Sequence, residues 1–226
     1  MSNLRRKWRR WAKVIDSAIL DEIRVDKVVF DNYRRILDAN PRIQKPATFH
    51  QWVMGNYGST LVLQVRRLAD DNSRSYSVRR LIGSIFQNHK LISRRAFLMS
   101  HRPQDRSYAE RMWLVYTEPS NPEVLPRGIC DRDLRILKEV AARATRLVDR
   151  DIAHLDRRRR ARRLPYDEIF DALEAQAALA AKYADLVGYR MPGTIMNGAY
   201  GEDWVRLFKE PWVIPHPDDR LGRHCR

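Results

Sequence analysis

Cysteine and glycine are both scarce in this chain, and it contains no long apolar run. There are 2 cysteines among 226 residues, which argues against a disulfide framework or a zinc cluster. Glycine occurs only 9 times, and this scarcity favours helices over sheets. Since no stretch of about 18 apolar residues is present, we expect no membrane-spanning helix. The N-terminus lacks the apolar region of a secretory signal, so we expect a cytoplasmic protein.

Positive charge is what the chain has in excess. Its 43 Lys and Arg residues outnumber 28 Asp and Glu residues, which gives a formal net charge of +15. Such an excess favours a polyanionic partner, namely RNA, DNA or an anionic membrane surface. A membrane is the weakest of the three, because no basic stretch is backed by a strongly apolar helix face. Arginine predominates, and its guanidinium can hold a phosphate with two donors.

Apolar residues recur three or four positions apart over five segments, which predicts five main helices. We expect these helices at residues 6–38, 49–71, 78–87, from 131 to a point before Pro165, and at 166–187. Ser77 and Asp131 are suitable N-caps, and Gly188 is a suitable residue just past a helix end. The proline-containing region 101–127 is expected to be a connection with one or two helical turns. The fold class predicted is an all-α helical bundle.

The first and second helices carry two further features. The buried stripe of the first is expected to run from Trp8 to Leu37 and to include Val29. In the second, Gly55 and Gly58 each cost roughly 1 kcal/mol relative to alanine, which a close approach of two helices would explain. The basic start of the chain, residues 5–11, is interleaved with tryptophans. It fits either contact with nucleic acid or inward packing of the tryptophans.

The pattern changes after Gly188. Residues 189–226 contain prolines, glycines and tryptophans and show little periodicity. We therefore predict a helical domain over residues 1–188, followed by an irregular extension over 189–226. The extension is expected to lie on the helical body or to be partly loose.

The residues best suited to chemistry lie late in the fourth predicted helix. Arg150 and His154 are four apart and would share one helix face, with Asp151 within reach of His154. A histidine exchanges protons near neutral pH, an arginine stabilises charge on phosphate, and a carboxylate orients the imidazole. This set suffices for RNA cleavage by its own 2′-hydroxyl without a metal. A helix-face cluster of salt bridges is the alternative.

An arginine block surrounds this set and is the predicted RNA-binding surface. It comprises Arg146, Arg157, Arg158, Arg159 and Arg160. Phosphate contacts from such a block would make RNA binding strongly salt-dependent. Arg66 and Asp70, four apart in the second helix, are expected to form a structural polar clamp. The remaining histidines show no metal-ligand spacing, so we expect neither a metal nor another cofactor.

Two stretches resemble the HEPN (higher eukaryote and prokaryote nucleotide-binding) superfamily, specifically its abortive-infection U type. Residues 57–70 end in Arg-Leu-Ala-Asp and precede Ser-Val-Arg-Arg-Leu-Ile at 77–82. They are similar to the family's Arg-Leu-x-Asp helix end and its Ser-Leu-x-x-Leu-Leu helix start. Residues 150–156, Arg-Asp-Ile-Ala-His-Leu-Asp, are similar to its Arg-Asp…Ile-Ala-His-x-Asp signature. With the helix order, the resemblance covers roughly residues 10–188.

The resemblance implies a homodimeric all-α bundle that cuts RNA without metal at a cleft shared by two copies. Arg150, Asp151 and His154 would line that cleft, in a toxin or phage-defence protein often paired with a neutralising partner protein. One departure bears on catalysis: only three residues separate Arg150 from His154, fewer than the family pattern has, whereas Arg146 leaves seven. The alternatives are a non-catalytic RNA- or nucleotide-binding module and a dimeric interaction subunit of a defence system.

Overall fold

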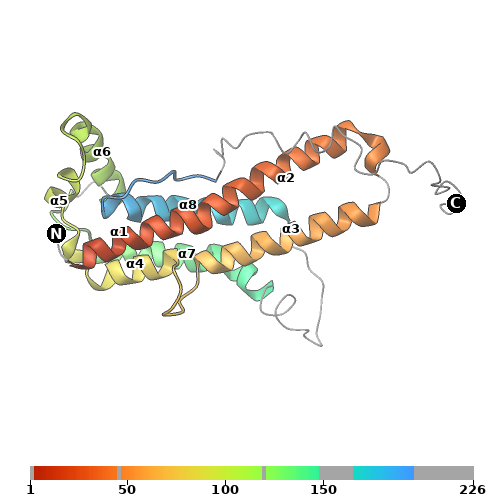
Figure 1. The fold of residues 1–226 in the computed structure, drawn as a ribbon. Coiled ribbons are helices and arrows are strands. Elements are labelled where there is room, and N and C mark those ends of the chain that lie inside the picture. The colour runs from red at the N-terminus through yellow and green to blue at the C-terminus, as the bar shows by residue number, and fades with distance from the viewer. Residues whose placement is uncertain (1–2, 45–46, 119–120, 148–164, 196–226) are drawn as a thin grey trace, which may run out of the picture.

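The structure, a computed structural model, is an all-α bundle, as the sequence predicts (Figure 1). It describes residues 3–44, 47–118, 121–147 and 165–195. In these residues the only β-type pairing is an isolated bridge between Ser93 and Val124. The α-helices are α1 (Asn3–Ile15), α2 (Asp21–Ala39), α3 (Ala47–Leu68), α4 (Val78–Gln87), α5 (Arg94–Leu98), α6 (Arg106–Thr117), α7 (Arg127–Leu147) and α8 (Tyr166–Leu186).

These helices form a long bundle with a small cap at one end. A π-helical turn, η1 (Asp16–Leu20), joins α1 to α2 in one continuous rod. The chain then returns through α3 and α4, and both of these helices pack along α7. α8 contacts α1, α3, α4 and α7 and so lies at the centre of the packing. α5 and α6 cover the end at which α1 begins (Figure 1).

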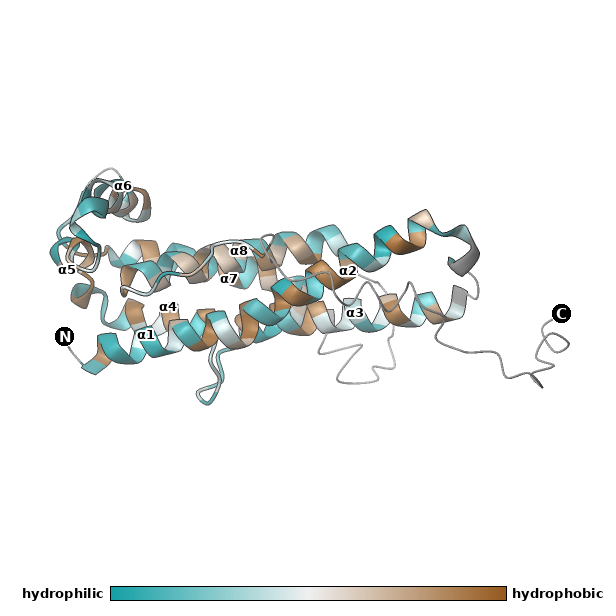
Figure 2. Cartoon of the chain, turned by 45° about the horizontal axis from the view of Figure 1, so that its top comes forward, coloured by the Kyte–Doolittle hydropathy of each residue, from teal (hydrophilic) through white to brown (hydrophobic). Residues whose placement is uncertain are grey.

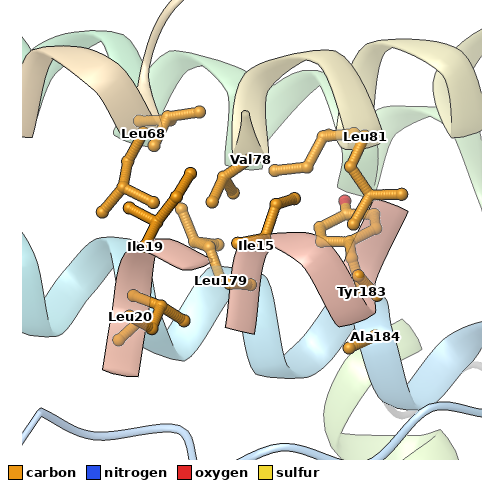
Figure 3. Packing of buried hydrophobic residues seen from close by; sticks show 14 of the residues in the cluster. Ile15, Ile19, Leu20, Leu68, Val78, Leu81, Leu179, Tyr183 and Ala184 are labelled. Carbon is orange, nitrogen blue, oxygen red and sulfur yellow. The ribbon is translucent and has the colours of Figure 1, made fainter. Parts of the chain in front are cut away.

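The core is a continuous set of apolar side chains from every rod of the bundle. Figure 3 shows Ile15 and Ile19 of the first rod between residues of α3, α4 and α8. Trp8 is also fully buried, and its indole N–H donates to Ser84 Oγ at 2.8 Å. Hydrophilic residues cover the outer faces of the helices (Figure 2). This separation of apolar and polar faces is what the three- and four-residue spacing predicts.

The buried stripe of α2 differs from the predicted one at Val29, and Leu37 is only partly buried. Val29 is exposed, and Phe30 is buried in its stead. The apolar spacing does not predict burial of Phe30, because the preceding position of the stripe is Lys27, a polar residue. The Lys27 stem is buried, while its ammonium group lies 4.4 Å from the Phe170 ring centre and 2.7 Å from an Asp31 oxygen. A lysine can occupy such a position because only its charged end needs a polar partner.

The boundaries of two helices also correct the sequence reading. α6 is a full helix of 12 residues, where one or two turns were predicted. α7 begins at Arg127, so Asp131 is not its N-cap. Asp133 lies inside α7 and is buried, and its carboxylate accepts from Lys182 Nζ at 2.7 Å and Tyr183 Oη at 3.0 Å. Asp133 therefore fixes the register of α7 against α8.

After α8 the chain turns and lies against the bundle. Gly188 has a φ of +83°, the left-handed conformation that ends many helices, as the sequence predicts. Residues 189–195, here called the strap, then run along α8 and the first rod (Figure 1). Arg24 donates to the strap carbonyls of Pro192 and Thr194, each at 3.2 Å. It also pairs with Asp16 of the π-turn at 3.0 Å.

Candidate functional site

The residues predicted to act on RNA follow directly after α7. Arg146 is exposed in the last turn of that helix. Outside the described residues lie Arg150, Asp151, His154, Arg157, Arg158, Arg159 and Arg160. The face-sharing arrangement of the Arg–Asp–His set therefore stays a prediction. What the structure does define is the support on either side of this segment, at the end of α7 and the start of α8.

The end of α7 is held next to the start of α8. The two helices pack against each other, and Arg143 of α7 forms an ion pair with Glu168 of α8. Both side chains are exposed, and an exposed pair contributes only about 0–1 kcal/mol. The position of the two ends therefore depends mainly on buried residues such as Ala144 and Ile169. The last turns of α7 and the first turn of α8 are thus neighbours on the bundle.

Tyr166 fixes the start of α8 to α3. Its hydroxyl donates to the Met54 carbonyl at 2.6 Å, and its ring packs against Phe30, with ring centres 5.0 Å apart. A Cβ at Gly58 would lie 3.2 Å from the Tyr166 hydroxyl, so the close approach expected at Gly58 is confirmed. The same expectation is wrong for Gly55, where a Cβ would meet nothing within 4 Å.

Asp70 serves the turn between α3 and α4. Its carboxylate accepts the backbone N–H of Asn72 at 3.1 Å. Its carbonyl accepts from the hydroxyl of Ser77, whose oxygen in turn accepts the backbone N–H of Arg80 at 3.2 Å. Ser77 is thus the N-cap of α4, as predicted. Asp70 has a structural role in this turn, and its pairing with Arg66 stays a prediction.

A buried cluster that the sequence did not reveal joins α5, α6 and α8. His101 Nε2 lies 3.3 Å from an Asp185 oxygen, and Tyr116 Oη donates to the other oxygen at 3.1 Å. The His101 and Asp185 side chains are 1% and 12% exposed, so both are shielded from water. No local motif announces this cluster, because its members lie far apart in the chain.

The protonation of this cluster follows from its hydrogen bonds. His101 Nδ1 lies 3.0 Å from the Phe97 carbonyl, which can only accept, so we assign a proton to Nδ1. Nε2 faces Asp185 at 3.3 Å, and a proton on Nε2 or on the carboxyl is needed to join these two groups. Burial raises the pKa of the Asp185 carboxyl, although His101 and the Tyr116 hydroxyl oppose the rise. Burial also raises the pKa of Tyr116, and the neighbouring carboxylate adds to this.

A cavity of about 440 Å³ opens beside this cluster. Its charged and aromatic lining comprises Tyr108, Tyr116, Lys182, Asp185 and Arg190. Each charged group is already engaged: Lys182 with Asp133 at 2.7 Å, and Arg190 with Asp105 at 3.5 Å. The cavity thus offers a ligand no unpaired charge, so the Arg–Asp–His segment stays the stronger candidate site.

The described residues contain no group of three or more His, Cys, Asp or Glu that could hold a metal ion. No helix in this part of the chain has the length and apolarity needed to cross a membrane. No protein-family profile, curated protein or solved structure matches the chain.

Proposed function

We propose that this protein is a metal-independent endoribonuclease of the phage-defence or toxin type, acting through Arg150, Asp151 and His154. The observation that carries the proposal is the segment 146–163, where this set lies within a block of arginines. The resemblance of 150–156 and 57–82 to the HEPN superfamily adds support. So does an all-α body in which the helices flanking the segment pack side by side.

In the proposed reaction, the 2′-oxygen of a ribose attacks the adjacent phosphorus as the bond from phosphorus to the 5′-oxygen breaks. His154 takes the proton from the 2′-hydroxyl as a base and, as an acid, gives it to the departing 5′-oxygen. Arg150 stabilises the charge that develops on the phosphate, and Asp151 orients the imidazole. The products are a 2′,3′-cyclic phosphate and a 5′-hydroxyl. Arg157 to Arg160 hold the backbone on either side.

The test is cleavage of a mixed RNA pool in EDTA by the wild type, Arg150→Ala and His154→Ala. We expect the wild type to leave cyclic phosphate ends and each variant to lose activity about 100-fold or more. His50→Ala is the matched control, because His50 lies in α3, hydrogen-bonded to Tyr33 at 2.5 Å. Equal cleavage by all four proteins would contradict the proposed site.

A second candidate function is RNA binding without cleavage. The short spacing between Arg150 and His154 favours it, since it departs from the pattern of catalytic HEPN proteins. Under this alternative the wild type binds RNA in a salt-dependent way, cuts none, and binds equally well after His154→Ala. Absence of RNA binding at low salt would instead favour a dimeric subunit whose charge serves an acidic protein partner.

The proposal includes a homodimer, because the cleft it invokes is built from two copies of the motif. Light scattering should then give twice the mass of one chain. Mixing Arg150→Ala with His154→Ala chains should restore part of the activity, since each mixed dimer regains one intact arginine and one intact histidine. A monomeric protein that cleaves RNA would remove the shared cleft from the proposal but would leave the catalytic set in place.

A further inference from the structure

The basic start of the chain forms a helix face that the proposed catalytic segment does not account for. α1 contains no carboxylate anywhere in its length. Its inner face carries Trp8, Ala12 and Ile15, all fully buried. One edge is used structurally, since Arg9 Nε donates to the Val187 carbonyl at 2.6 Å, at the end of α8. The outer face remains.

Four cations form a continuous row on this outer face. They are Arg6, Lys7, Arg10 and Lys13, all exposed. Residues three or four apart on a helix have Cβ atoms about 5–6 Å apart, so each cation neighbours another. Within the described residues none of the four has an ion-pair partner; Arg6 donates to the Asn3 side chain. Like charges at this spacing repel and destabilise the helix. The stability of α1 therefore does not account for the row.

An aromatic residue lies at the edge of the row. Trp11 is only partly buried, unlike Trp8. Lys7 Nζ is 4.8 Å and Arg80 Cζ of α4 is 4.9 Å from the centre of its ring. The exposed ring of Tyr76 meets it edge-on, with ring centres 6.3 Å apart. Arg80 thus extends the basic surface from α1 onto α4, which lies beside it (Figure 1).

The class of partner follows from these features. A groove or face that combines cations with aromatic rings is the common means of binding single-stranded nucleic acid, through its phosphates and its bases. An anionic membrane fits less well, because the apolar side of α1 is fully used in the core and none is left to insert into lipid. The surface combines positive charges with aromatic ring edges. It therefore suits RNA, which carries bases as well as phosphates, better than a polyanion without bases.

We propose that the outer face of α1, with Trp11 and Arg80, is a second surface for single-stranded RNA. This inference rests on the proposed function, and it adds the course that the RNA takes over the protein. α1 lies at the α5–α6 end of the bundle, whereas α7 runs away from that end before it reaches the arginine block (Figure 1). An RNA strand that contacts both α1 and the end of α7 would extend along the bundle.

The test measures binding of a labelled single-stranded RNA in EDTA, with His154→Ala in every protein so that the RNA stays intact. The test variant is Lys7→Gln/Arg10→Gln/Lys13→Gln. We expect its Kd at low salt to rise about 10-fold or more, and its salt slope to fall by about 2, since each lost phosphate contact removes about 0.7 for single strands. Trp11→Leu should weaken binding without changing that slope.

The matched control is Arg102→Gln/Arg106→Gln/Arg111→Gln, which removes the same charge from exposed positions at α6. If control and test variants weaken binding equally, net charge alone attracts the RNA and the proposal is wrong. It is also wrong if the test variant binds as the parent does, or if the parent binds no RNA. If RNA is bound through α1 while the protein with His154 cuts none, the surface stands and the ribonuclease proposal fails. Unchanged thermal unfolding confirms folding of each variant.

Discussion

At Asp185 the fold places a carboxylate between His101 and Tyr116, with 12% of its side chain exposed. Burial raises its pKa, so the folded state holds the proton to a higher pH than the unfolded chain does. Stability then falls as pH rises from about 4, the ordinary aspartate value, through the raised pKa. Asp185→Asn keeps a neutral acceptor for Tyr116 and escapes this loss. Its stability relative to the wild type should therefore grow with pH over that window.

Urea unfolding between pH 4 and 7 measures this difference. Asp171→Asn is the control, because it removes an exposed carboxylate from the same helix and should follow the wild type at every pH. A constant gap between Asp185→Asn and the wild type across the range would mean that Asp185 titrates alike in the folded and unfolded states.

At the scale of elements, Arg24 joins the π-turn to the strap. Its side chain is 4% exposed and pairs with Asp16, which is 15% exposed. Arg24→Ala leaves that carboxylate without its closest cation and frees two strap carbonyls. We expect a loss of about 3 kcal/mol or more in the free energy of unfolding, as for other broken buried pairs, with faster hydrogen exchange in residues 189–195.

Arg67→Ala provides the comparison for this prediction. Arg67 also lies in a helix and pairs with a carboxylate, that of Glu22, but both side chains are about half exposed. Removing such a pair should cost less than about 1 kcal/mol. Equal losses in the two variants would show that burial of the Arg24 pair contributes nothing to the attachment of the strap.

For the whole molecule, the net charge of +15 means that repulsion among many cations opposes the attraction within the exposed ion pairs. Repulsion acts over the full surface and is screened once the Debye length falls to about 10 Å, at 0.1 M salt. The midpoint of thermal unfolding should thus rise by a few degrees between about 10 mM and 150 mM NaCl. Sucrose at equal osmolality is the uncharged control. A falling midpoint would mean that the ion pairs outweigh the repulsion.

The bundle could be predicted because its long helices have a clear apolar spacing. Ser77 and Gly188 also mark helix ends, since serine is preferred at helix starts and glycine just past helix ends. α6 could not be predicted as a full helix, since it buries little besides Ala109 and Trp113 and lies between prolines. The buried partners of Asp133 could not be predicted, because only the fold brings Lys182 to it. The Arg–Asp–His set is predicted by local spacing and lies outside the described residues, whereas the Asp185 cluster has no local signal.

The packing of α1 against α8 has a consequence for synthesis of the chain. Trp8 and Ile15 are made well before α8, yet α8 forms part of the wall that buries them and ends at Leu186. At about 5–20 residues per second, the nascent chain waits roughly ten to thirty seconds for that wall. Throughout this time the apolar stripe of α1 is only partly covered while its cationic face is already present. The body can close only when α8 has left the ribosome.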